Sequence, residues 1–298
     1  MSSHYDPNGA DEGITDPWGG RGKAPSASVK KSSSYGRPYP VVYGTCAVQG
    51  IPLWVYDKGN LKFLPDGAYG AENGGRAAEV QYAFSYGPIQ GFDSLIHSQR
   101  LYGPSGIGTA YVGATNPPSG TSVPDFFLGD GTTTAWAHYA GAGWESRIPW
   151  PMLAVMRCRY FWVPDGAGTI PDVKGVLAGR FATHANTKRA TTFPTWTRYD
   201  ALPGDVIRDL IENATYGLGK PSGTVVTAAG SDGSAASSYD RYCTANGWYI
   251  ALAVDQDISV EEVVGQVLQA TNSVGVWSEG YFKIFPLGDS AIGTYTPV

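Results

Sequence analysis

Several common patterns are missing from this sequence, and each absence excludes a class of protein. Charged residues make up only 16% of the 298 residues and the net charge is −5, so no global basic field attracts nucleic acid. No run of 18 apolar residues occurs, so we expect no membrane span. The first 30 residues lack the apolar core of a secretory signal. These absences favour a chain made in a cytoplasm.

Cysteine and histidine are scarce. Cys46, Cys158 and Cys243 lie far apart, with no CxxC pair among them, and are expected to remain reduced, buried thiols. None of the four histidines occurs in an HExxH or HxH spacing. They are His4, His97, His138 and His184. The sequence therefore predicts neither a disulfide framework nor a bound metal or cofactor.

Catalytic motifs are also missing. There is no G-x-S-x-G, no Walker loop and no catalytic-cysteine surround, and the glycine cluster at residues 103–108 follows no βα unit. Carboxylate pairs for glycoside hydrolysis are not recognisable from spacing, so they stay open. The available carboxylates are Asp93, Asp125, Glu145 and Asp172. We expect no enzyme; a carbohydrate-binding or glycan-cleaving protein is the alternative.

The residues that are abundant favour β-structure and turns. Gly 40 and Pro 21 imply many turns, and an aromatic content of 13% suits half-buried sheets and contacts between subunits. Residues 1–37 are polar and glycine-rich without apolar periodicity. They are expected to form a flexible arm, or an arm that becomes ordered along a neighbouring subunit.

Residues 38–199 have the pattern of a β-rich domain with a glycine-rich insertion at about 103–147. A strand at 79–86 places Val80, Tyr82, Phe84 and Tyr86 on one face, and 152–163 is apolar on both faces, as in a central strand. Arg157 and Arg159 within it need partners or must lie at a subunit contact. Shorter strands are predicted at 39–43, 45–48, 51–56, 61–64, 92–102 (two strands, or one strand with a bulge), 126–128, 135–139 and 173–180, with a turn at 57–60.

Residues 200–298 have the pattern of an α+β domain with two or three short helices. The clearest helix starts near Pro203 and stops at the sequence YGLGKP of residues 216–221, where glycines and a proline prevent its continuation. Its apolar stripe contains Val206, Ile207, Leu210, Ile211 and Ala214. A short helix at 239–245, a strand at 248–253, a helix capped by Ser259 with Glu262, and a hairpin at 274–285 follow. The predicted fold class is therefore α+β.

Four motifs in this order resemble the central tail-hub, or tail-tip, proteins of long-tailed, lambda-type bacteriophages. A GPI-x-G turn follows a strand, an IPD-V segment enters another, a DVIRDL helix ends in YGLG, and a short helix ends in Tyr-Cys. The matching residues are Gly87, Pro88, Ile89, Gly91, Pro171, Asp172, Asp205, Tyr216, Gly217, Gly219 and Cys243. The resemblance spans about residue 38 to the C-terminus.

The resemblance implies a structural protein of the virion tail tip, assembled in the host cytoplasm. Hubs of this family are homotrimers that bind a ring of distal tail proteins, other tail-tip or fibre proteins and the tape-measure protein. They close the tail tube until DNA passes, which they contact only non-specifically. Family members usually continue into receptor-reaching segments, whereas this sequence ends at Val298, so the resemblance implies either a short version of the hub or a hub divided among several proteins.

Overall fold

The computed structural model describes residues 38–57, 76–97, 100–102, 125–131, 150–163, 172–185, 199–230, 233–255 and 257–297. The expected arm at 1–37, the return strand at 61–64, the strand at 135–139, Pro171 and most of the 103–147 insertion lie outside these residues. Within them the fold is β-rich with three short helices, which confirms the α+β class.

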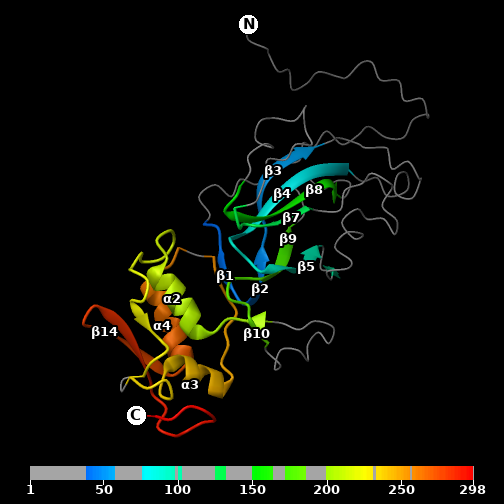
Figure 1. Ribbon diagram of the computed structural model, residues 1–298. Coiled ribbons are helices and arrows are strands. Elements are labelled where there is room, and N and C mark those ends of the chain that lie inside the picture. The colour runs from blue at the N-terminus through cyan, green and yellow to red at the C-terminus, as the bar shows by residue number, and fades with distance from the viewer. Residues whose placement is uncertain are drawn as a thin grey trace, which may run out of the picture.

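Two four-stranded antiparallel sheets form the larger unit (Figure 1). The first contains, in spatial order, β3 (Ile51–Asp57), β4 (Arg76–Tyr86), β8 (Leu153–Val163) and β7 (Asp125–Leu128). The second contains β2 (Thr45–Gln49), β9 (Val173–Ala178), β5 (Gly91–His97) and β6 (Arg100–Tyr102). Apolar side chains from both sheets share one core, so the sheets pack face to face.

Strand β8 lies inside its sheet, between β4 and β7, which confirms the prediction of a central strand. Arg157 is nearly fully buried in it, lies opposite Asp125 of β7, and has its guanidinium 4.4 Å from the centre of the Phe127 ring. Burial lowers the pKa of Arg157, and the Asp125 charge opposes that shift. The cation–π contact with Phe127 and the charge of Asp125 both favour the charged form of this buried arginine.

Three of the four residues predicted to share one face of β4 do so, and the fourth, Tyr86, does not. Val80, Tyr82 and Phe84 lie in the core between the two sheets, as the alternation predicts. The register shifts between Ala83 and Ser85, and Tyr86 instead packs at the edge of the second core of the chain. The strand irregularity therefore redirects one aromatic ring from the sandwich toward the smaller unit.

The smaller unit packs three helices against a three-stranded sheet. The helices are α2 (Pro203–Glu212), α3 (Tyr239–Asn246) and α4 (Val260–Ala270). The sheet order is β12 (Val225–Val226), β15 (Tyr281–Pro286) and β14 (Ser273–Ser278), with β12 parallel to β15. None of the helices in the described part of the chain has the length and apolar character that crossing a bilayer needs.

The helix ends follow the predicted signals with one exception. Ser259 accepts a hydrogen bond from the Glu262 amide at 3.1 Å, which confirms the predicted cap of α4. Helix α2 begins at Pro203 but ends at Glu212, because Asn213 leaves helical geometry with ψ 123. Ala214 was predicted on the stripe and is exposed beyond the helix.

Strand pairing connects the two units. Strand β1 (Val41–Tyr43) pairs antiparallel with β13 (Leu252–Val254), and Val41 and Tyr43 belong to the core of the smaller unit. Strand β13 begins later than predicted, since Ile250 only bridges Ala201. A short ladder between β10 (His184–Ala185) and β11 (Tyr199–Asp200) lies at the same crossing. From β1 onward, the chain therefore passes from the smaller unit into the sandwich and then returns to the smaller unit.

Candidate functional site

The carboxylate of Asp209, on α2, is the centre of a polar network between the two units. Its Oδ2 accepts hydrogen bonds from the Tyr43 hydroxyl at 2.8 Å and from the Tyr216 hydroxyl. Its Oδ1 accepts from Arg180 Nη2 at 3.2 Å and from Asn213 Nδ2 at 3.4 Å. Four donors occupy the four acceptor positions of a carboxylate, so the hydrogen-bonding capacity of Asp209 is filled from within the chain.

Arg180 connects the network to the sandwich. It follows β9, and its backbone amide donates to the Val42 carbonyl at 2.7 Å, so the residue is fixed against β1. Its Nη2 contacts Asp209, while Nη1 donates to the Gly87 carbonyl at 3.2 Å. One guanidinium therefore joins the turn after β4 to helix α2 across the boundary of the two units.

Aromatic rings surround this ion pair. The Tyr43 and Phe181 rings are stacked at 6.3 Å and 6°, and the Tyr86 and Tyr216 rings meet edge to face at 5.8 Å. The Arg180 guanidinium lies over Phe181 and Tyr216, at 5.8 and 5.5 Å from the ring centres. The rings limit water access, which strengthens the polar contacts they cover.

The two phenols at Asp209 are held in the neutral form. Burial raises the pKa of Tyr43 well above its ordinary value, and the nearby Asp209 charge raises it further. Burial also raises the pKa of Tyr216, together with its hydrogen bond to Asp209. Both hydroxyls therefore remain donors over the whole neutral range.

The YGLG exit of α2 positions Tyr216 in this network. Gly217 donates to the Asn213 carbonyl at 3.1 Å, and a Cβ at this glycine would lie 2.4 Å from the Leu210 carbonyl oxygen. Gly219 has φ +62, and Lys220 donates back to the Ile211 carbonyl at 3.0 Å. Only a residue without a side chain fits at Gly217, so the motif closes the helix tightly enough for Tyr216 to reach Asp209.

The GPI-x-G turn forms the other side of the junction. Gly87 packs on Gly129, where a Cβ at Gly87 would lie 2.6 Å from the Gly129 Cα, and its amide donates to the Met152 carbonyl at 2.8 Å. The Gly87–Pro88 peptide is cis, and Pro88 is exposed. Ile89 is buried in the sandwich core. This packing holds the Gly87 carbonyl where Arg180 reaches it.

The remaining motif residues lie away from the junction. Gly91 begins β5, Asp172 is exposed just before β9, and Pro171 lies outside the described residues. Cys243 is buried in α3, where burial raises its pKa to about 12. None of the three cysteines forms a disulfide; Cys158 and Cys243 are buried and Cys46 is half-buried.

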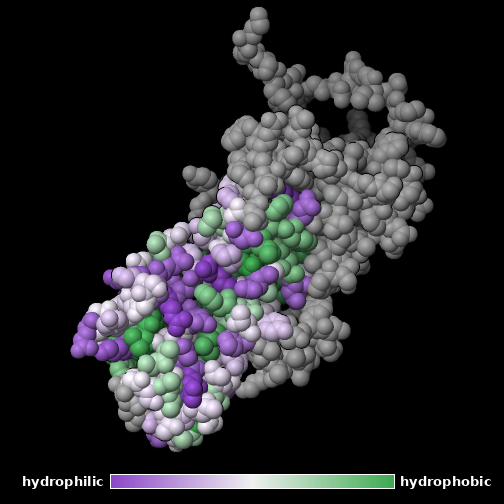
Figure 2. Space-filling model, in the orientation of Figure 1, coloured by the Kyte–Doolittle hydropathy of each residue, from purple (hydrophilic) through white to green (hydrophobic). Residues whose placement is uncertain are grey.

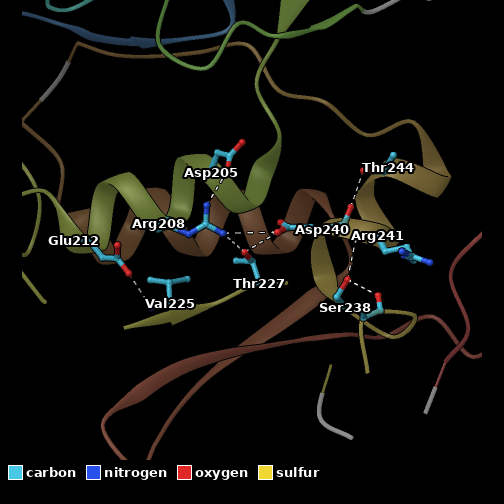
Figure 3. Close-up of polar contacts among 10 residues, drawn as sticks. Asp205, Arg208, Glu212, Val225, Thr227, Ser238, Asp240, Arg241 and Thr244 are labelled. Carbon is cyan, nitrogen blue, oxygen red and sulfur yellow. Dashed lines mark hydrogen bonds and ion pairs between the residues drawn. The ribbon is translucent and has the colours of Figure 1, made fainter. Parts of the chain in front are cut away.

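Asp205 belongs to a second cluster on another side of α2 (Figure 3). Arg208 Nη1 donates to Asp205 at 2.8 Å, and Nη2 lies 3.7 Å from Asp240 of α3. The Thr227 hydroxyl donates to Asp240 at 2.8 Å and accepts from Arg208. Burial raises the pKa of Asp240, and the Thr227 bond and Arg208 charge oppose the shift. This cluster ties α2 to α3 within the smaller unit.

Sequence reasoning singled out Gly87 and Tyr216 but missed the residues that bring them together. Asp209 stands inside the DVIRDL motif, where only its first aspartate was singled out. Tyr43 and Arg180 carried no local signal, because their bonds to Asp209 span 166 and 29 residues of sequence. Only a long-range contact would have identified them.

Comparison with known proteins adds little. No protein-family model and no curated protein matches the chain. Among solved structures, the chain is similar to a chain from the virion of a native gene transfer agent particle, with 13% identity and a TM-score of 0.47. The match covers 87% of this chain and 55% of that one, so this chain spans about half the length of the chain it matches. A likeness of this size carries no conclusion about function.

Proposed function

We propose that this chain is a structural hub protein at the distal end of a phage-like tail. Three copies would surround the tail axis, close the tube and open for DNA. One observation carries the proposal: the GPI-x-G turn and the helix ending in YGLG, the two clearest motifs of the tail-hub resemblance, meet at the Asp209 network. The Gly87 carbonyl accepts a hydrogen bond from Arg180, a partner of Asp209, and the Tyr216 hydroxyl donates to Asp209 itself.

The network explains why a hub would keep these motifs. A subunit that closes a tube has to hold its two units at one angle, since a hinge between them would loosen the ring. A buried carboxylate whose donors include two from distant segments, Tyr43 and Arg180, fixes such an angle. Its acceptor positions are filled from within the chain, which supports a role in holding the shape of the subunit.

Composition supports the same role. Contacts in a ring of identical subunits favour aromatic, weakly charged surfaces, and the chain is 13% aromatic and 16% charged. Its net charge of −5 lets DNA pass without sticking. The partners proposed with this role are the distal tail ring, other tail-tip or fibre proteins and the tape-measure protein. The proposed location is the tail tip of the virion.

An averaged electron-microscopy map of the purified particle tests the proposal. We expect density for this chain at the distal end of the tail, in three copies or a multiple of three. Absence of the chain from the tail, or a copy number not divisible by three, would count against it. Hydrolysis of peptidoglycan or capsule by the purified chain, abolished by one Asp or Glu substitution, would favour the glycan-cleaving alternative instead.

A further inference from the structure

The hairpin of β14 and β15 exposes an apolar sheet face. Alternation places Val274, Val276 and Ser278 of β14 on the face opposite to α4, across from Phe285, Lys283 and Tyr281 of β15. Val274 and Val276 are each 44% exposed and Tyr281 is 48% exposed. In Figure 2, hydrophobic surface reaches solvent at the end of the molecule where Figure 1 places this hairpin, beside hydrophilic surface. A sheet face open to water ordinarily carries polar residues, whereas four of these six positions are apolar or aromatic and two, Ser278 and Lys283, are polar.

Strand β14 is also an edge strand. It is the last strand in the order β12-β15-β14, so within the described part of the chain its outer edge pairs with no strand. Its sequence, SVGVWS, contains no charge and no proline, the usual protections against pairing with another chain. The next apolar side chain along it, Trp277, is 50% exposed. The edge and the face together provide a complete site for an added strand.

Acidic side chains border this site. Helix α4 covers the inner face of the hairpin and reverses into β14, so its first turn lies at the Trp277 end of the strand. Four carboxylates at and before this turn are exposed, and none forms an ion pair with a described residue. They are Asp255, Asp257, Glu261 and Glu262. One side of a strand added to β14 would face the exposed valines, and the other would face these carboxylates and Trp277, whose ring centre lies 5.9 Å from Lys220 Nζ.

We propose that residues 17–37 of a neighbouring copy bind here as an added strand. This segment contains five basic residues and no acidic one, whereas residues 200–298 contain twelve acidic and four basic ones. The basic residues are Arg21, Lys23, Lys30, Lys31 and Arg37. In an extended segment, Val29 and Tyr35 share one side with Lys31 and Arg37, and Lys30 occupies the other. Val29 and Tyr35 cover the valines of β14 while Lys30 faces the α4 carboxylates.

The position of the arm favours a neighbour over the same copy. Residue 38 leads directly into β1, and Figure 1 shows β1 and β14 on opposite flanks of α2 and α4. Twenty-one extended residues span about 70 Å, enough to cross to an adjacent subunit. An arm that leaves from one flank and binds on the other makes a head-to-tail contact, which closes into a ring when repeated. The inference rests on the proposed function, because it requires several copies of the chain to lie side by side.

Cross-linking between two differently labelled full-length chains tests the inference. In a Cys46→Ser background, a chain with Val29→Cys is mixed with a chain with Val276→Cys and oxidised gently. We expect a covalent dimer at least tenfold more abundant than with Gln269→Cys, an exposed position on the solvent side of α4, in place of Val276→Cys. Equal yields for the two positions would overturn the inference. So would a disulfide that forms only within a chain carrying both cysteines, or a dimer from Val276→Cys chains alone.

Charge reversal adds a second measurement on the same chains. Lys30→Glu with Lys31→Glu in the arm should reduce the dimer at least tenfold. Glu261→Lys with Glu262→Lys in the acceptor chain should restore it when combined with the reversed arm. Failure of the acceptor reversal to restore the dimer would contradict docking beside α4.

The location of the chain separates this inference from the proposed function. Chains found at the tail tip that do not cross-link would overturn arm docking and leave the hub role standing. Chains that cross-link as described but are missing from the tail would leave arm docking intact and overturn the hub role.

Discussion

Helix α2 carries two aspartate–arginine pairs, Asp209 with Arg180 and Asp205 with Arg208, that differ in almost every respect. The Asp209 pair has side chains 9% and 16% exposed, whereas those of the Asp205 pair are 28% and 35% exposed. Arg180 is reached across 29 residues of sequence, while Arg208 is three residues from its partner on the same helix. Buried donors surround the first pair, and water reaches the second. The buried Asp209–Arg180 pair therefore joins two units of the chain, whereas the more exposed Asp205–Arg208 pair lies within one helix.

The difference predicts the largest effect at Asp209. Asp209→Ala leaves the Arg180 cation and two phenols without their acceptor, which should lower the free energy of unfolding by about 3 kcal/mol. Urea unfolding of the purified chain measures this. Glu261→Ala on the exposed face of α4 is the control and should change little. A loss at Asp209 no larger than the control would show that the network contributes nothing to stability.

The second effect concerns the phenols. Tyr216→Phe removes one donor and should cost about 1 kcal/mol. Burial and Asp209 raise the pKa of Tyr43 and Tyr216, so the folded chain holds these protons more tightly than the unfolded chain does. Stability should be intact below pH 10 and fall as the pH rises beyond it, less steeply in Tyr216→Phe. Phenolate absorbance measures the ionisation of the tyrosines across this range, and urea unfolding measures the stability. If stability fell equally steeply with pH in the wild type and in Tyr216→Phe, the raised pKa of Tyr216 would be contradicted.

Local patterns in the sequence predicted most of the fold because the forces that shape each element act over a few residues. The stripe of α2, the Ser259 cap and the closing hairpin are of this kind. The stripe overran the helix end at Ala214, since an apolar residue does not reveal that Asn213 leaves helical geometry. The junction was not predictable, because the donors to Asp209 come from β1, from the segment after β9 and from the segment after α2. Gly217 and Gly219 were found from the stop of the helix, whereas Gly87 was singled out through the family motif; the arm and most of the insertion lie outside the described residues.

The third effect, at Arg208, should be smaller. Arg208→Ala removes a partly exposed i,i+3 pair, so we expect a loss below about 1 kcal/mol that shrinks further in high salt. Unfolding measured at low and high sodium chloride tests this. A loss equal to that of Asp209→Ala, unaffected by salt, would remove the distinction between the two pairs.

The smallest effect is expected at Asp240. Burial raises its pKa, so the folded chain binds this proton more tightly than the unfolded chain, and stability should rise slightly as the pH falls from neutral toward the ordinary value of 3.8. Asp240→Asn keeps the shape and removes this dependence. Parallel pH profiles of the two chains between neutrality and pH about 4 would contradict the role of burial.

Scanning calorimetry of the wild-type chain and of Asp209→Ala tests most directly whether the network joins the two units. If Asp209 couples them, the wild type unfolds in one transition and the variant in two, since the sandwich and the smaller unit then melt separately. Two transitions already present in the wild type, or a single unshifted transition in the variant, would contradict the coupling on which the proposed hub depends.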